Sequence, residues 1–398
     1  MPDSHSSKGD RFATRLSHAG RAGTKVRAFV NPPVHRGSTM LHVDCADRFA
    51  GGNQLLQDPM YGVMGNSTHH ALENVIAEVE GGTHCQVVSS GLSAVTTAML
   101  AYLKSGEHCL MPDSVYGPTR IFADGMLRGL GIETTYYDPV IDAAGLQGLM
   151  RPNTTVLYLE SPGSHTFEVQ DVPALAAVAH QHGAKVLMDN TWGIHHFQPF
   201  AFGVDASIQA LTKYPVGHSD VLLGSITVAD PAEWHRVRLA ALALGQYASP
   251  DDCWLCLRGL RTMSVRLAQQ SASALAVAEW LQTRPEVKQV LFPALPGAPG
   301  HELWKRDFTG ACSLFGVVFT PDIAVTATHA MIDALRLFGI GASWGGFESL
   351  VLPTSGYLVR TADTGDFGGA AARFHIGLED TADLIADLDQ AFTALHER

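Results

Sequence analysis

Three features of the sequence could do chemistry, and each follows a short apolar run typical of a buried β-strand. Gly91 comes after the run 84–88 and starts a helical pattern, so the free N–H groups of a helix start could bind a phosphate there. Asp189 ends a later run and places a carboxylate at the end of a strand. Lys213 follows the run 207–211, where partial desolvation would lower the pKa of its amine and make it a nucleophile.

Taken singly, each of these residues has a plainer interpretation: a glycine in a tight turn, an aspartate that caps a helix, and a solvated lysine. On one open sheet, however, ligands gather at the carboxyl ends of the strands. A phosphate cradle, a strand-end carboxylate and a nucleophilic lysine are the three parts that hold pyridoxal phosphate. We therefore predict pyridoxal 5'-phosphate as the cofactor and an amino acid as the small-molecule substrate, because the protonated ring withdraws electrons from the α-carbon.

The elements that must position these residues follow from an alternation of short β-branched runs with helical patterns between residues 84 and 228. This alternation predicts an α/β fold with a mostly parallel sheet covered by helices on both faces. The predicted strands are 84–88, 108–111, 133–137, 155–159, 185–188, 207–211 and 221–228.

After Asp251 the pattern changes to long helical stretches such as 263–282, followed by predicted strands at 314–319 and 374–376. A second, smaller α+β domain is therefore expected at the C-terminus. We divide the chain into an N-terminal arm (residues 1–65), a large domain that binds the cofactor (66–260) and a smaller C-terminal domain (261–398).

Charge and composition exclude several classes of protein. The chain has 398 residues, 27 Lys and Arg against 39 Asp and Glu, and a formal net charge of -12, so a nucleic-acid partner is not expected. No apolar run approaches the roughly 20 residues that span a bilayer, so no membrane partner is expected either. The first 23 residues lack the apolar segment of a secretory signal, which favours a cytoplasmic protein.

The cysteines and histidines do not form a convincing metal site. Cys253 and Cys256 have C-x-x-C spacing, but no second pair follows, and their neighbours look like a buried helix. His69-His70 and His195-His196 are pairs of sequence neighbours, whose side chains we expect to point apart. We therefore predict no metal.

Motifs spread from about residue 15 to the C-terminus resemble those of the Cys/Met-metabolism family of pyridoxal-phosphate enzymes, most closely its bacterial cystathionine β-lyase branch. The motifs are Tyr61-Gly62, Glu80-Gly81-Gly82, Glu160-Ser161-Pro162-Gly163-Ser164, Met188-Asp189-Asn190-Thr191-Trp192, Thr212-Lys213-Tyr214, Arg258-Gly259-Leu260-Arg261-Thr262, Ser343-Trp344-Gly345-Gly346 and His375-Ile376-Gly377-Leu378-Glu379-Asp380. The resemblance implies fold type I of the pyridoxal-phosphate enzymes.

The resemblance also implies roles for individual residues around the cofactor. Lys213 would bond covalently to the cofactor and move protons, Asp189 would pair with the pyridine nitrogen, and Tyr116 would stack on the ring. The cofactor phosphate would be contacted by Gly91, Leu92 and Thr212.

For the substrate, the resemblance implies that Arg373 clamps the α-carboxylate, with Ser343 and Trp344 beside it. Tyr61 would act as a catalytic and cofactor-binding residue in the site of a neighbouring subunit, because the family forms homotetramers built as dimers of dimers. The implied reaction is carbon–sulfur β-elimination from cystathionine or a related S-substituted cysteine, which gives a thiol, pyruvate and ammonia.

The sequence departs from the β-lyase pattern at Val63 and Met64, where that branch carries two arginines. Ala342 and Ala210 likewise replace a tyrosine and a serine. Met64 would make the distal part of the substrate pocket apolar. A γ-elimination or γ-replacement enzyme, or a pathway-specific lyase acting on an apolar amino acid, is therefore the alternative. A catalytically silent scaffold is a third reading, against which the intact catalytic residues argue.

Overall fold

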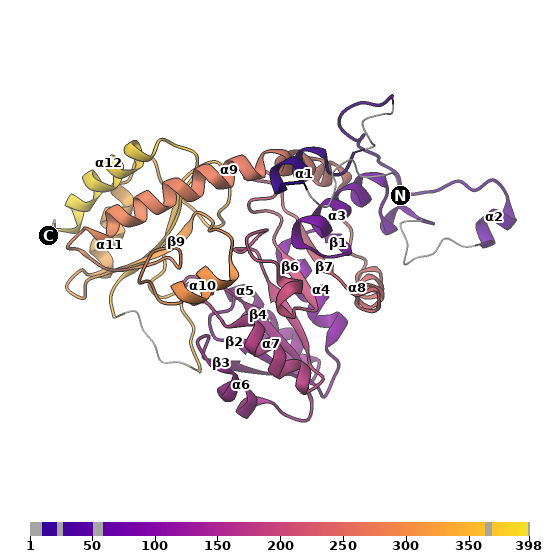
Figure 1. Ribbon diagram of the computed structural model, residues 1–398, viewed down its shortest axis with the longest axis horizontal. Helices are drawn as coiled ribbons and strands as arrows, with labels where there is room; N and C mark the ends of the chain where they lie inside the picture. Colours follow the sequence, from indigo (N-terminus) through magenta and orange to yellow (C-terminus); the bar gives the residue numbers. More distant parts are fainter. Residues whose placement is uncertain (1–9, 22–26, 51–58, 363–367, 397–398) are drawn as a thin grey trace.

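Two β-sheets, joined by one long helix, organise the computed structural model of the chain (Figure 1). The structure describes residues 10–21, 27–50, 59–362 and 368–396. The larger sheet contains β1 (His84–Val88), β2 (His108–Pro112), β3 (Glu133–Tyr137), β4 (Thr154–Glu160), β5 (Lys185–Asp189), β6 (Ala206–Gln209) and β7 (Gly224–Val228).

The strand order of the larger sheet is β1-β7-β6-β5-β4-β2-β3. The pairs from β6 through β3 are parallel, and β7 runs antiparallel to both of its neighbours. The predicted fold class, a mostly parallel sheet within an α/β protein, is therefore confirmed.

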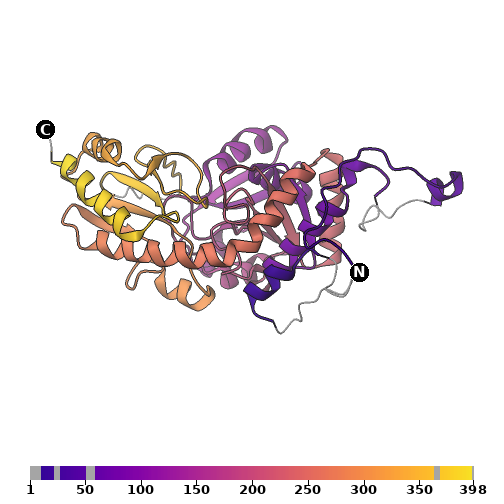
Figure 2. The same ribbon diagram turned by 90° about the horizontal axis from the view of Figure 1, so that it is seen from above.

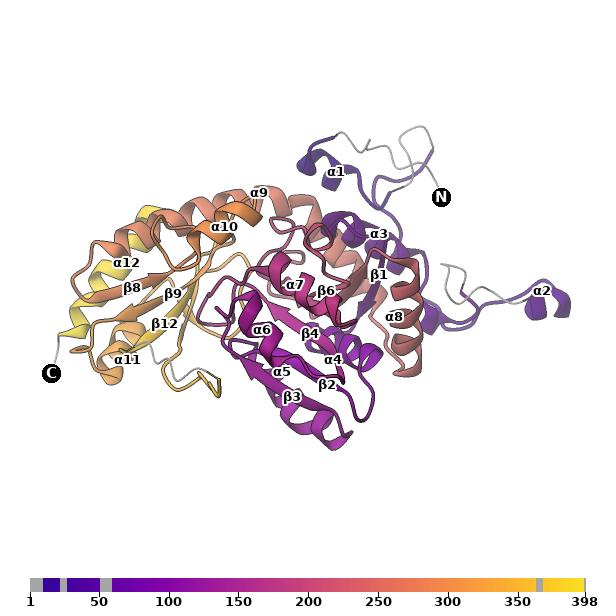
Figure 3. The ribbon, with the colours of Figure 1, turned by 60° about the horizontal axis from the view of Figure 1, so that its bottom comes forward.

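Helices cover both faces of this sheet, as the views of Figures 1 and 3 show. Side chains alternate along β4: Val156 and Tyr158 enter a core shared with α4 and α8, whereas Leu157 and Leu159 enter the core on the other face. The helices of this half are α3 (Ser67–Glu80), α4 (Gly91–Tyr102), α5 (Gly117–Phe122), α6 (Ala143–Leu149), α7 (Val172–Gln181) and α8 (Pro231–Ala243).

The smaller sheet has the order β10-β11-β12-β9-β8. Its strands are β8 (Val287–Leu291), β9 (Leu314–Phe319), β10 (Gly339–Ile340), β11 (Leu350–Pro353) and β12 (Ala371–His375). Its helices are α10 (His301–Asp307), α11 (Val325–Ala334) and α12 (Thr381–Phe392).

Helix α9 (Pro250–Gln282) runs from the larger sheet to the smaller one (Figure 2). Three local features favour a helix start here. Ser249 accepts a hydrogen bond from the Asp251 N–H at 3.2 Å, and Pro250 occupies the first turn. Two aspartates in the first turn interact favourably with the positive end of the helix dipole. The predicted domain boundary at residue 260 lies inside this helix, and the division into domains stays a prediction.

The described part of the N-terminal arm consists of α1 (Phe12–His18), which packs on α9, and an extended portion with α2 (Cys45–Ala50). In Figures 1 and 3, α2 projects away from the rest of the chain. Arg36 anchors the arm to Asp251 at the start of α9, with 2.9 Å between Nε and Oδ2.

Strand boundaries differ from the sequence prediction near Lys213. β6 ends at Gln209 instead of residue 211, and β7 begins at Gly224 instead of residue 221. The intervening chain turns because the Thr212 hydroxyl bonds to the backbone of Leu223, accepting from its N–H and donating to its carbonyl, each at 3.1 Å. This turn takes Lys213 out of the sheet.

The cysteine pair lies on α9, where Cys253 and Cys256 are fully buried and burial raises the pKa of both thiols. This placement agrees with the buried helix that the sequence predicts. Among the residues that the structure describes, no helix is both long and apolar enough to cross a membrane.

Gly259 on α9 provides a test of how the two halves are joined. A Cβ at this position would lie 2.2 Å from the carbonyl oxygen of Val216 and 2.4 Å from that of Pro215, in the turn that follows Lys213. We expect Gly259→Ala to lower the free energy of unfolding by about 1–3 kcal/mol through overpacking. Gly148→Ala on α6 is the matched control, because no atom lies within 4 Å of its added Cβ. Equal chemical-denaturation curves for the two variants would refute this packing argument.

Candidate active site

Lys213 lies at the centre of the predicted site, in the turn after β6. Its backbone N–H donates to the Ala210 carbonyl at 3.1 Å, and its carbonyl accepts from the Gly217 N–H at 2.8 Å. The side-chain Nζ donates to Ser343 Oγ at 2.6 Å and lies 5.2 Å from the centroid of the Trp344 ring. The second half of the chain therefore supplies the immediate partners of the amine.

The surroundings of Lys213 lower the pKa of its amine to about 8. Burial is the largest cause, because it disfavours the ammonium form, and the Arg373 guanidinium acts in the same direction. The Asp189 carboxylate opposes both effects. The unprotonated amine is therefore far more populated near neutral pH than in an ordinary lysine, and it is available as a nucleophile or base.

Asp189 ends β5 and pairs in register with Glu160, which ends the neighbouring strand β4. Its Oδ1 accepts hydrogen bonds from the Thr191 N–H at 3.0 Å and the Thr191 hydroxyl at 2.6 Å. Burial nevertheless raises the pKa of this carboxyl above its ordinary value. A cationic partner at this strand end would stabilise the carboxylate form.

The start of α4 meets the turn that carries Lys213. Ser90 caps the helix by accepting from the Ser93 N–H at 3.1 Å, whereas the N–H groups of Gly91 and Leu92 have no partner within the described residues. A Cβ on Gly91 would lie 2.6 Å from the Cβ of Ala210, so only glycine permits this approach. Two free N–H groups at a helix start form a suitable phosphate cradle.

Tyr116 precedes α5 and comes from the loop after β2. Its backbone N–H donates to Glu160 Oε2 at 2.8 Å, and its side chain is 43% exposed. Burial of the hydroxyl and then the carboxylates of Asp189 and Glu160 raise the pKa of Tyr116, whereas Arg373 lowers it. The ring therefore shares its electrostatic environment with Asp189 and Arg373.

Arg373 on β12 belongs to the smaller sheet and is 9% exposed. Burial lowers the pKa of its guanidinium to about 10, and Nη2 donates to the Ser343 carbonyl at 3.1 Å. Ser343 adopts a left-handed backbone with φ of 73°, which few residues other than glycine adopt readily. This conformation presents its carbonyl to Arg373 and its hydroxyl to Lys213.

The structure brings Lys213, Asp189, Tyr116, Arg373 and Ser343 together, but two predicted residues lie elsewhere in this single chain. Tyr61 is 52% exposed, and Met64 is 7% exposed with its sulfur accepting from the Met60 N–H at 3.4 Å. Within the described residues, no hydrogen bond or ring contact joins either side chain to the Lys213 cluster. Their roles at a neighbouring subunit's site stay predictions.

Two buried residues of the site were missed by the sequence reasoning. Glu160 was noted only as part of a motif, although it fixes the backbone of Tyr116. His375 Nε2 accepts from the Gly345 N–H at 3.1 Å, and burial lowers the pKa of its ring to about 3. The end of a predicted parallel strand is the signal that could have indicated Glu160, because Asp189 was found in that way.

Comparisons with known proteins agree with this geometry. Residues 13–393 match the model of the Cys/Met metabolism PLP-dependent enzyme family. A putative cystathionine β-lyase from Rhizobium johnstonii is 47% identical over 386 residues, covering 96% of this chain and 96% of that protein. Cystathionine β-lyase MetC from Escherichia coli is 41% identical over 392 residues, covering 97% of this chain and 99% of that protein.

Among solved structures, metB from Corynebacterium glutamicum superposes with a TM-score of 0.89 at 28% identity, covering 98% of this chain and 99% of that one. The chain has the fold of the type I pyridoxal 5'-phosphate (PLP) enzymes. It belongs to the Cys/Met metabolism family of PLP-dependent enzymes, and the predicted family, cofactor and enzyme class are confirmed.

The residues present fit this cofactor. The two free N–H groups at the start of α4 suit its phosphate, the buried Asp189 carboxyl suits a protonated pyridine nitrogen, and the Lys213 amine is placed and tuned to bond with an aldehyde. Thr212 is the exception, because its hydroxyl already donates to the Leu223 carbonyl.

The lowered pKa of Lys213 can be measured in cofactor-free protein through the pH dependence of covalent PLP attachment, followed by absorbance. We expect the attachment rate to rise with a midpoint near pH 8, because only the neutral amine reacts. Arg373→Leu removes a nearby positive charge, stabilises the ammonium and shifts the midpoint upward. Arg128→Leu, at an arginine whose side chain is 74% exposed, should leave it unchanged. A wild-type midpoint at the ordinary lysine value of 10.5 would contradict the desolvation argument.

Proposed function

We propose that this chain is a carbon–sulfur β-lyase that cleaves cystathionine or a related S-substituted cysteine to a thiol, pyruvate and ammonia. The observation that carries the proposal is the buried Lys213 amine, which donates to Ser343 Oγ at 2.6 Å and has a pKa near 8 set by burial, Arg373 and Asp189. Relatives named as cystathionine β-lyases at 41–47% identity support the choice of substrate.

Lys213 has two tasks in the proposed reaction: it would hold the cofactor through a covalent bond, and its free Nζ would remove the α-proton of the substrate. A base with a pKa near the working pH is effective for such a transfer. When bound, PLP supplies an electron-withdrawing ring that stabilises negative charge at the substrate α-carbon. Asp189 would keep the ring nitrogen protonated, since a buried carboxylate is stabilised by a cation beside it.

Substrate orientation falls to Arg373, which offers a planar fork of N–H donors to the α-carboxylate. The Ser343 carbonyl accepts a hydrogen bond from the Arg373 guanidinium, and the Ser343 hydroxyl lies 2.6 Å from Lys213 Nζ. One residue therefore contacts both the arginine that would bind the carboxylate and the lysine that would act as the base. Tyr116, from the other half of the chain, would stack on the cofactor ring, and Trp344 borders the amine. Holding these groups at fixed spacing converts binding energy into orientation of the bond that breaks.

Phosphate binding is assigned to the backbone of Gly91 and Leu92, with Thr212 beside them. Neither Val63 nor Met64 provides the positive charge of the β-lyase arginines.

We further propose a cytoplasmic homotetramer, a dimer of dimers, in which Tyr61 completes a neighbouring subunit's site. Its side chain is 52% exposed, which suits that role.

The second candidate is a γ-elimination or γ-replacement enzyme, or a lyase for an amino acid with an apolar side chain. The uncharged Met64 favours it, because the charged distal group of cystathionine loses a potential partner there. In this case the Lys213 cluster performs the same first proton transfer, and the distal part of the pocket selects a different leaving group.

Product analysis on cystathionine separates these candidates. We expect pyruvate and homocysteine from the purified holoenzyme, because β-elimination breaks the bond between the β-carbon and sulfur. Formation of 2-oxobutyrate and cysteine would instead establish γ-elimination. If neither pair forms while S-substituted cysteines or apolar amino acids turn over, cystathionine is excluded as the substrate.

Val63→Arg tests whether the missing charge limits cofactor binding. We expect dissociation of PLP to slow by about tenfold, corresponding to about 1.4 kcal/mol of added phosphate attraction. Val63→Met is the size-matched, uncharged control and should release PLP at the wild-type rate. Equal release from the two variants would show that position 63 does not approach the phosphate.

A further inference from the structure

One irregular segment crosses from the smaller sheet to the loops that carry the site. Residues 354–362, here called the strap, follow β11 and lead toward β12. Tyr357 and Val359 are 60% and 59% exposed, so the outer side of the strap faces solvent. The strap contains no helix or strand, and its position therefore depends on a few side-chain anchors.

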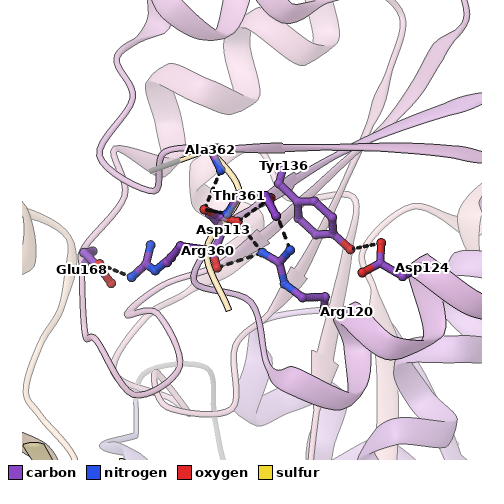
Figure 4. A network of polar contacts seen from close by, with 8 residues as sticks. All are labelled: Asp113, Arg120, Asp124, Tyr136, Glu168, Arg360, Thr361 and Ala362. Carbon is purple, nitrogen blue, oxygen red and sulfur yellow. Dashed lines mark hydrogen bonds and ion pairs between the residues drawn. The ribbon is translucent and has the colours of Figure 1, made fainter. Parts of the chain in front are cut away.

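The main anchor is Asp113, which directly follows β2. Its Oδ2 accepts from the backbone N–H groups of Thr361 at 2.7 Å and Ala362 at 2.8 Å, and its Oδ1 accepts from the Thr361 hydroxyl at 3.1 Å (Figure 4). Arg120 also donates to Oδ1. The Asp113 side chain is 0% exposed, so these donors replace the water that a carboxylate needs.

A second anchor joins the strap to the loop after β4. Arg360 Nη2 donates to Glu168 Oε1 at 2.6 Å, and the arginine side chain is only 8% exposed. Figure 4 shows both anchors side by side along the strap. On the far side of Asp113, the Arg120 guanidinium stacks 3.6 Å from the centroid of the Tyr136 ring, which keeps Arg120 in place.

These anchors connect two catalytic side chains that come from different sheets. Asp113 lies three residues before Tyr116, and the intervening Ser114 carbonyl accepts from the Ser164 N–H at 2.9 Å. At its other end the strap is tied to β12, because the Ser355 hydroxyl accepts from the Ala371 N–H at 2.9 Å. Arg373 is two residues further along that strand.

We propose that Asp113 is a positioning residue that, by holding the strap, fixes the spacing between Tyr116 and Arg373 across Lys213. The inference rests on the proposed function, which assigns Tyr116 to the cofactor ring and Arg373 to the substrate carboxylate. A carboxylate is required because two backbone N–H groups and a guanidinium converge on it, and an amide would turn an NH2 group toward one of these donors. Asp113 thus acts through the backbone and touches neither cofactor nor substrate.

The test compares Asp113→Asn with Asp124→Asn in the holoenzyme. Asp124 is the matched control, since it accepts from the Tyr136 hydroxyl at 2.9 Å in the same network, is 41% exposed and has no contact with the strap among the described residues. For Asp113→Asn we expect chymotryptic cleavage after Tyr357 to accelerate about fivefold or more and the KM for substrate to rise about tenfold. Visible circular dichroism of the bound cofactor should also weaken. Asp124→Asn should match the wild type within about twofold in all three.

Cleavage and circular dichroism are measured without substrate, so they test the strap even where cystathionine is not cleaved and the proposed function fails. Wild-type cleavage and dichroism in Asp113→Asn would overturn the proposal. If that variant does not fold, Arg360→Gln decides, because it weakens the second anchor and leaves Asp113 intact. Faster cleavage after Tyr357 in Arg360→Gln supports the role of the strap, and an unchanged rate refutes it.

Discussion

Desolvation of one lysine amine is the constraint on which the rest of the site depends. Burial disfavours the ammonium form of Lys213, and Arg373 adds like-charge repulsion, so the pKa falls to about 8. The same burial raises the pKa of the Asp189 carboxyl, and Thr191 and the lysine itself offset this effect only in part. A cation held at the strand end satisfies Asp189, which is why a protonated heterocycle complements this site better than solvent does.

The charged groups that set the pKa of Lys213 come from both sheets. The larger sheet contributes Asp189 and the turn with Lys213, whereas Arg373 and Ser343 come from the smaller half. The connection is close-packed: a Cβ on Gly345 would lie 2.8 Å from the Tyr214 N and 2.9 Å from the Lys213 carbonyl carbon. Ser343, two residues before Gly345, has a strained left-handed backbone conformation that this packing holds in place. Small changes at the junction therefore reach the catalytic amine directly.

Sequence patterns could predict the parts of the site that local rules determine. Gly91 and Lys213 follow a strand and Asp189 ends one, and strands that run the same way bring their carboxyl ends to one edge. Arg373 and Ser343 required the family resemblance, because periodicity does not say how a second sheet docks. Asp113 escaped notice because its partners are backbone N–H groups 248 and 249 residues away, which leave no trace in side-chain spacing.

Two departures from the family pattern, Val63 and Met64, lie outside the cluster of residues around Lys213. Val63 and Met64 lie on the turn after Tyr61, whose geometry is set from within the same chain: the Met64 carbonyl accepts from Arg238 on α8, and the Gly62 N–H donates to the Ser38 carbonyl at 2.7 Å. The loss of two arginines therefore alters charge without loosening the turn. The Lys213 cluster contains none of these positions, so proton transfer at the α-carbon can stay constant while the group that leaves changes. The lowered pKa of Lys213 is set by burial, Arg373 and Asp189, so substitutions at positions 63 and 64 leave these causes in place.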